Sequence, residues 1–119
     1  MNIQDVLQKA VEQKVSDIFI IAGAPISFKI GDVIRPYSEE KMMPEDTADA
    51  AKQIYELDHR DISSLYASGD DDFSFSIKHL SRFRCNAYKQ RGSLAMILRV
   101  VSFELPDYST LGIPDTVID

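Results

Sequence analysis

The strongest constraint on the fold comes from residues 73–103, which contain six basic residues and no Asp or Glu. Within this segment, Phe83, Cys85 and Ala87 alternate with polar or basic residues, which is typical of a half-buried strand. Residues 94–101 are apolar except for Arg99, as in a more deeply buried strand. The pattern predicts a β-hairpin over residues 82–101.

The hairpin is expected to place two arginines together. A charged Arg99 facing the core would be very costly, so it should share the outer face with Arg84. If residues 91–92 form the turn, Gln90 pairs with Ser93, and Arg84 then lies directly opposite Arg99. Arg-Gly is not a favoured two-residue turn, so the shared face depends mainly on the hydrophobic alternation.

This cationic element stands out because the rest of the chain is acidic. The other 88 residues carry seven basic and 19 acidic residues, and the 119-residue chain has a net charge of −6. Adjacent arginines repel each other, and a phosphate would relieve the repulsion through bidentate guanidinium contacts. The alternative is a solvated sheet face whose charges pair with the acidic remainder. Both interpretations stay open at this point.

The rest of the chain predicts one α+β domain with a mainly antiparallel sheet and helices packed on one face. The expected elements are a helix over residues 3–14, strands over 15–21, 26–30 and 33–36, a helix beginning at Pro44, a second helix capped by Asp58 and ended by Gly69, and a strand over 73–77.

Several function classes receive little support. Residues 70–72, three consecutive aspartates, are expected to form a polar turn before Phe73, and no metal site is predicted. Cys85 faces the core and should be inert. There is no P-loop motif, no signal peptide and no apolar run long enough for a bilayer, so a cytoplasmic location is expected. Nucleic-acid binding is disfavoured by a pI of about 4.8 and by the lack of aromatic residues on the basic face.

An ordered set of segments resembles a known family. The segments are Ser16-Asp17-Ile18-Phe19-Ile20, Gly23 and Pro25, Asp72-Phe73-Ser74-Phe75-Ser76, Arg82-Phe83-Arg84-Cys85-Asn86, Gln90-Arg91-Gly92 and Arg99. Together they look like the N-terminal domain of the type IV pilus retraction ATPase, the twitching-motility motor, with related secretion and pilus-extension ATPases. Two departures are Phe19, where the family usually has His, and a first hairpin turn, residues 29–32, that looks one residue short.

The resemblance implies a PAS-like N-terminal domain over residues 1–105 and, over residues 106–119, the start of a linker to a RecA-like ATPase domain that this chain does not include. The parent would be a hexameric ATPase that uses ATP and Mg, peripheral at the inner face of the cell membrane, with an inner-membrane pilus platform protein as partner. Arg84 and Arg99 match the family positions that reach the ATP phosphates, and Arg82 and Arg91 are candidates for secondary basic contacts.

Two other expectations accompany this one. The fragment alone, lacking a P-loop, should be inactive as an ATPase and should need no cofactor of its own. The alternative function is a freestanding PAS-like module that binds a small ligand or a protein.

Overall fold

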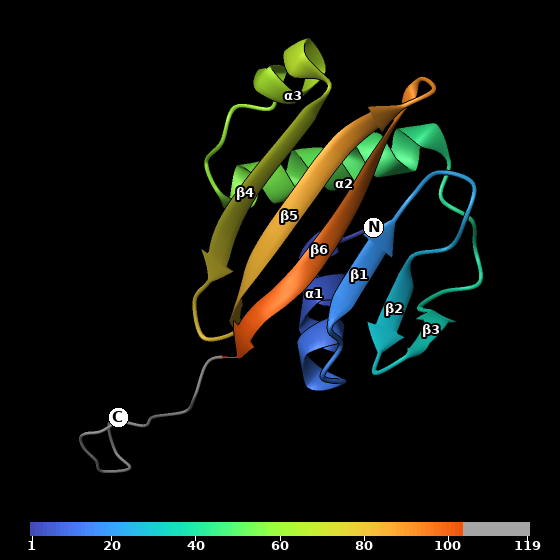
Figure 1. Cartoon of the computed structure of the whole chain (residues 1–119), viewed down its shortest axis with the longest axis vertical. Helices are drawn as coiled ribbons and strands as arrows, with labels where there is room; N and C mark the ends of the chain where they lie inside the picture. Colours follow the sequence, from blue (N-terminus) through green and yellow to red (C-terminus); the bar gives the residue numbers. More distant parts are fainter. Residues whose placement is uncertain (104–119) are drawn as a thin grey trace.

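The computed structural model describes residues 1–103 of the chain (Figure 1). The predicted linker over residues 106–119 lies outside the described residues. The elements, in chain order, are α1 Ile3–Glu12, β1 Asp17–Ile20, β2 Ser27–Ile30, β3 Val33–Pro36, α2 Pro44–Leu57, α3 Ser63–Ser68, β4 Asp70–Ile77, β5 Ser81–Gln90 and β6 Ser93–Phe103.

The strands form one six-stranded sheet in the order β3-β2-β1-β6-β5-β4, and every neighbouring pair is antiparallel. The first and last strands of the described chain therefore lie side by side in the middle of the sheet (Figure 1). Two strands on each side, β2–β3 and β5–β4, complete the sheet.

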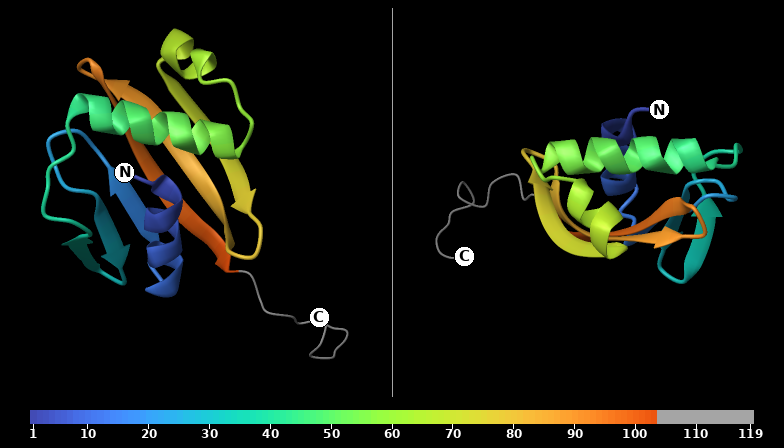
Figure 2. Two further views of the ribbon diagram at one scale, coloured as in Figure 1. Left: turned by 180° about the vertical axis from the view of Figure 1, so that it is seen from behind. Right: turned by 90° about the horizontal axis from the view of Figure 1, so that it is seen from above.

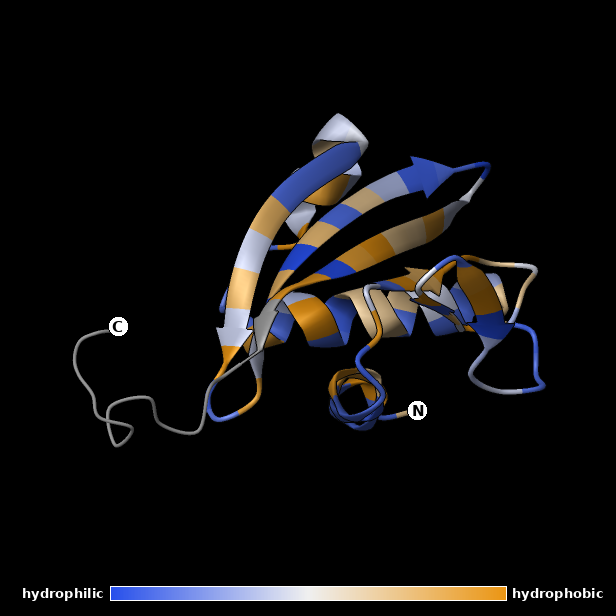
Figure 3. Cartoon of the chain, turned by 60° about the horizontal axis from the view of Figure 1, so that its bottom comes forward, coloured by the Kyte–Doolittle hydropathy of each residue, from blue (hydrophilic) through white to orange (hydrophobic). Residues whose placement is uncertain are grey.

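The helices α1 and α2 cover one face of the sheet and leave the other uncovered (Figure 2). Hydrophobic and hydrophilic residues alternate along β4 and β5, and the hydrophobic side of α1 faces the sheet (Figure 3). Residues with no exposed surface, such as Leu7, Ile54, Phe83 and Leu98, fill the layer between helices and sheet. The short helix α3 contributes the buried Leu65. The predicted α+β class, antiparallel sheet and helix-covered face are confirmed.

The helix α2 begins where the sequence predicts. Pro44 occupies the first turn, where its missing N–H costs no hydrogen bond, and the Asp46 carboxylate accepts a 2.8 Å bond from the Met43 N–H. The predicted cap at Asp58 is wrong, because Asp58 ends α2 instead of beginning α3. The Asp61 carboxylate accepts the Ser63 N–H at the start of α3, and Gly69 ends that helix at a left-handed φ of 90°.

The three consecutive aspartates do not form the predicted turn. They are the first three residues of β4, and they pair with residues 86–88 of β5. Gly69 already reverses the chain, so the strand starts at once, and the side chains of Asp71 and Asp72 point to opposite faces of the sheet. Each of these two carboxylates binds an arginine.

On the helix-covered side, Asp71 joins a small polar network. Its carboxylate accepts a 2.8 Å hydrogen bond from the hydroxyl of Tyr55, which is 1% exposed, and two 3.0 Å bonds from Arg60. The Arg60 guanidinium also lies 4.7 Å from the ring centre of Phe73. The network ties α2 and the following loop to the edge strand β4. Within residues 1–103, no helix is long and apolar enough to cross a membrane.

Candidate functional site

The predicted register of the cationic hairpin is confirmed. Arg91 and Gly92 form its turn at left-handed φ values of 49° and 81°, as a two-residue turn of this hand requires. Gln90 pairs with Ser93, and Arg84 lies directly opposite Arg99. Their side chains are 64% and 71% exposed, so both arginines lie on the uncovered face, as predicted.

The sheet register brings a carboxylate next to each arginine. Asp17 of β1 lies directly across from Arg99, and Ser74 of β4 lies directly across from Arg84. Asp72 shares the face with Ser74 because it is two residues earlier on the same strand. A row of side chains from four strands therefore meets on the face seen in Figure 1.

Each arginine is bound to one of these acids. Arg84 uses Nε and Nη2 to bind both carboxylate oxygens of Asp72, at 3.2 and 3.0 Å. Arg99 donates from Nε to one oxygen of Asp17 at 3.3 Å. Pairing with acidic residues, the alternative interpretation of the sequence, is therefore the arrangement in this structure.

The two acids sit in different surroundings. The Asp17 side chain is 12% exposed, and its second oxygen accepts a 2.9 Å hydrogen bond from the Ser16 hydroxyl. The Asp72 side chain is 47% exposed. The hydrogen bonds from Arg84 lower the pKa of the Asp72 carboxyl, and those same bonds raise the pKa of the Arg84 guanidinium. Asp72 is thus ionised at neutral pH.

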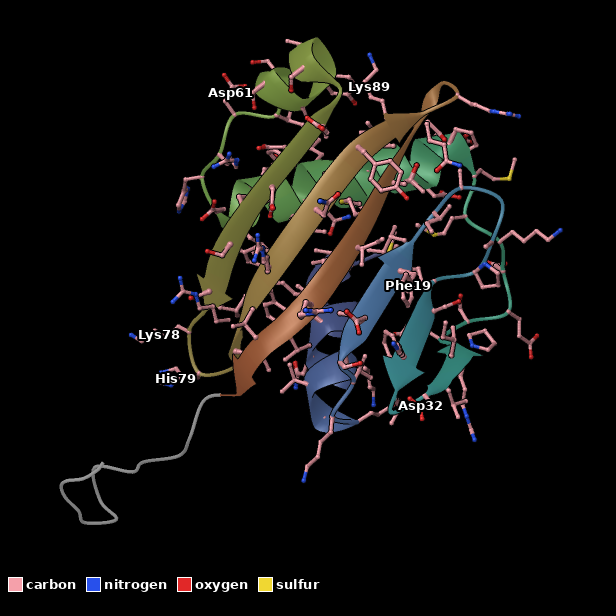
Figure 4. The ribbon with its side chains drawn as sticks, in the orientation of Figure 1. Phe19, Asp32, Asp61, Lys78, His79 and Lys89 are labelled. Carbon is pink, nitrogen blue, oxygen red and sulfur yellow. The ribbon has the colours of Figure 1, made fainter. Side chains whose placement is uncertain are left out.

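A shallow cavity of about 230 Å³ opens between the four charged residues. Its lining consists of Asp17, Asp72, Arg84, Asn86, Ile97 and Arg99. Phe19 lies on the same face of β1 as Asp17, directly across from Ile97 (Figure 4). An apolar patch therefore borders the charged cavity. Both guanidinium groups of the cavity are more than half exposed, while Asp72 and Asp17 occupy part of their donors.

Of the two secondary basic residues, Arg82 lies beside the arginine pair and Arg91 lies far from it. Arg82 lies two residues from Arg84 on the same face and lines a neighbouring cavity of about 400 Å³ with it. Its Nη2 lies 3.5 Å from the Ser74 hydroxyl. Arg91 occupies the hairpin turn, seven residues from Arg84 along β5, or roughly 23 Å at the usual strand rise. The structure does not bring Arg91 to the cluster.

Sequence reasoning missed the two carboxylates. Asp17 is the one charged residue in the predicted strand over residues 15–21, and this lone charge was the signal that Asp17 lies on the outer face of the strand. Asp72 continues the alternation of buried and exposed residues seen over residues 73–77, and this alternation places it on the outer face with Ser74. In the described residues, no three His, Cys, Asp or Glu side chains gather as metal ligands.

The chain is similar in sequence to a type IV pilus ATPase and to an uncharacterised protein. The type IV pilus ATPase PilU of Pseudomonas aeruginosa is 29% identical over 116 residues, which cover 97% of this chain and 30% of that protein. The uncharacterised protein YggR of Escherichia coli is 27% identical over 115 residues, covering 96% of this chain and 33% of that protein. No family model matches the chain.

Solved ATPase structures are also similar to this chain. The pilus retraction motor PilT, solved with bound ADP, has a TM-score of 0.72 and 34% identity, covering 97% of this chain and 33% of that one. The Legionella pneumophila ATPase DotB shares the fold, with a TM-score of 0.65 at 21% identity over 95% of this chain and 32% of that one. The predicted resemblance to the N-terminal domain of these ATPases is confirmed, and this chain spans about a third of the length of its relatives.

Proposed function

We propose that the chain is the N-terminal, PAS-like domain of a pilus or secretion motor ATPase, and that Arg84 and Arg99 contact the phosphates of ATP bound by the parent's ATPase domain. The observation that carries the proposal is the cross-strand pairing of Arg84 with Arg99 on the uncovered sheet face. Two guanidiniums at adjacent positions can converge on one phosphate group.

Three further features support the proposal. Both guanidiniums are more than half exposed, so a bound nucleotide can reach them. The helices lie on the opposite side of the sheet, which leaves this face free for another domain (Figure 2). The solved relative PilT holds ADP, and the present chain matches a third of it.

For the parent protein, the proposal includes ATP hydrolysis with Mg, a hexameric assembly, and work in pilus retraction at the inner face of the cell membrane beside a platform protein. The arginines would stabilise charge on the transferring phosphoryl group, the role that arginine fingers fill in other phosphoryl-transfer enzymes. Arg82 would extend the same cationic surface.

The test is steady-state ATP turnover by the full-length parent with Arg84→Ala or Arg99→Ala. Removing an arginine that stabilises a transferring phosphate costs about 10³-fold or more in rate in other systems, so a loss of that order is expected. Thermal melting should change little, because both side chains are exposed and their truncation leaves no core cavity. Lysine replacements should restore only part of the rate, since an ammonium cannot reproduce the planar fork.

Arg35→Ala is the matched control. Arg35 is another exposed strand arginine, on β3 at the edge of the sheet remote from β5. Its replacement should leave turnover unchanged. Near-normal turnover in both the Arg84 and the Arg99 alanine variants would overturn the proposal and identify the cationic face as a solvated or protein-docking surface.

A further inference from the structure

The ion pair between Arg84 and Asp72 has a consequence for phosphate binding. Asp72 occupies the Nε and Nη2 groups of Arg84, at 3.2 and 3.0 Å. These two N–H groups lie side by side and point in the same direction, so they could equally donate two parallel hydrogen bonds to a phosphate. A carboxylate and a phosphate cannot hold these two donors at the same time.

The second arginine is held differently. Among the described residues, Arg99 uses only its Nε toward Asp17, so its Nη groups remain available to an incoming anion. Asp17 is 12% exposed and also bound by the Ser16 hydroxyl, so it is fixed in the sheet. Asp72 is 47% exposed, belongs to the edge strand β4, and is the more easily displaced acid.

We propose that Asp72 is a displaceable carboxylate that competes with phosphate for Arg84, while Asp17 is a fixed anchor that positions Arg99. A polyphosphate first binds the Nη groups of Arg99. It binds the Nε and Nη2 groups of Arg84 only after it has displaced the Asp72 carboxylate. Asp72 thus regulates the site: it neutralises Arg84 when no phosphate is present and weakens anion binding until the ligand brings enough negative charge. This inference rests on the proposed phosphate role of the arginine pair.

The test uses the 119-residue chain with inorganic tripolyphosphate as the probe. The arginine Nε–Hε resonances of Arg84 and Arg99 are followed by NMR at low, constant ionic strength, which limits screening of exposed charges. Asp72→Asn removes the competing charge while keeping the side-chain size. It is expected to lower the dissociation constant of tripolyphosphate about three- to fivefold, because one exposed ion pair no longer has to be broken on binding.

Asp70→Asn is the matched control. Asp70 lies two residues earlier on the same strand and is exposed on the same face, and no ion pair involves it among the described residues. Its replacement changes the net charge of the chain by the same amount, but it should change the dissociation constant less than twofold. Adding Arg84→Ala to Asp72→Asn should abolish the gain, because the freed fork is then missing.

Equal affinities of the Asp72→Asn and Asp70→Asn chains would overturn the inference, since the effect would then be general electrostatics. Binding of tripolyphosphate to no variant would overturn it as well, because Asp72 would not be what limits access to Arg84. The proposed function fails by a different result, namely normal ATP turnover in the parent without either arginine. A parent that needs both arginines, together with unchanged tripolyphosphate affinity in Asp72→Asn, would leave the proposed function standing and refute the exchange alone.

Discussion

Replacing Asp71 with alanine removes the acceptor of a buried hydroxyl. Tyr55, 1% exposed, donates a 2.8 Å hydrogen bond to Asp71, whose own side chain is 14% exposed. Without Asp71, the Tyr55 hydroxyl loses this hydrogen-bond acceptor while the residue remains 1% exposed. A buried polar group left without a hydrogen bond costs about 1–3 kcal/mol.

We therefore expect Asp71→Ala to lower the free energy of unfolding by about 2 kcal/mol and Tm by about 10 °C for a domain of this size. The exposed bonds to Arg60 add little to this figure, because solvent screens them. Asp72→Ala is the control: the residue is the next along the chain, it carries the same charge, and it faces the solvent side. Its Tm should change by no more than about 3 °C.

The pH dependence of the same variants adds a second measurement. The hydrogen bonds from Arg60, and next the one from Tyr55, lower the pKa of the Asp71 carboxyl in the folded chain. A carboxyl with a lowered pKa stabilises the fold above its unfolded value, near 3.9, and that contribution disappears as pH falls through the folded value. The stability difference between wild type and Asp71→Ala should therefore be largest at neutral pH and become smaller below about pH 4. It should not vanish there, because a protonated Asp71 carboxyl still accepts the hydrogen bond from Tyr55.

Urea unfolding followed by circular dichroism provides the assay, and Tyr55→Phe closes a double-mutant cycle. In the Tyr55→Phe background, no buried hydroxyl is left without an acceptor, so Asp71→Ala should cost much less than in the wild type. Equal losses for Asp71→Ala and Asp72→Ala, or a full loss in the Tyr55→Phe background, would refute this reasoning.

Four further outcomes are expected. Arg91→Asn should raise the free energy of unfolding by up to about 1 kcal/mol in urea titrations, because Arg91 adopts a φ of 49° and Asn-Gly suits this turn better; a lower stability would mean that the Arg91 side chain itself holds the turn. Phe83→Ala should lower the free energy of unfolding by about 3–5 kcal/mol in the same assay, since the ring is fully buried and stacks on Phe75 with 5.4 Å between the ring centroids. Burial raises the pKa of the Cys85 thiol to about 12, so a thiol reagent should label the native chain only through unfolding, and labelling at the rate of a free thiol would contradict this. Calorimetric titration of the 119-residue chain should detect no tight ATP binding, because its sequence has no P-loop motif; micromolar affinity would contradict the proposed division of labour with an ATPase domain.

Features encoded locally could be predicted from the sequence. The alternation in β5 predicted which side chains face the core and that Arg84 and Arg99 share the outer face. Their direct pairing followed only on the condition that residues 91–92 form the turn, which the structure confirms. The start of α2 at Pro44 followed from the usual preference of proline for a first turn.

The features that were missed depend on contacts between distant residues. Asp17 and Arg99 are 82 positions apart in the sequence, and only the central placement of β1 beside β6 brings them together. Three consecutive aspartates before Phe73 favour a polar turn, whereas in the structure Gly69 completes the reversal and the aspartates enter the strand. The carboxylate partners of the arginines became visible only with the sheet order.

The pairing of β1 with β6 also governs how the chain acquires its structure. The β1–β2–β3 part of the sheet has no partner for the inner edge of β1 until β6 has been synthesised. Contacts that close such long loops slow folding, because the chain entropy is lost before the contacts form. The hairpin of β5 and β6 joins residues that are close in sequence, so we expect it to form first and to serve as the template on which the N-terminal strands assemble. During synthesis on the ribosome, the edge of β1 therefore stays unpaired until residues 96–99 have emerged from the exit tunnel.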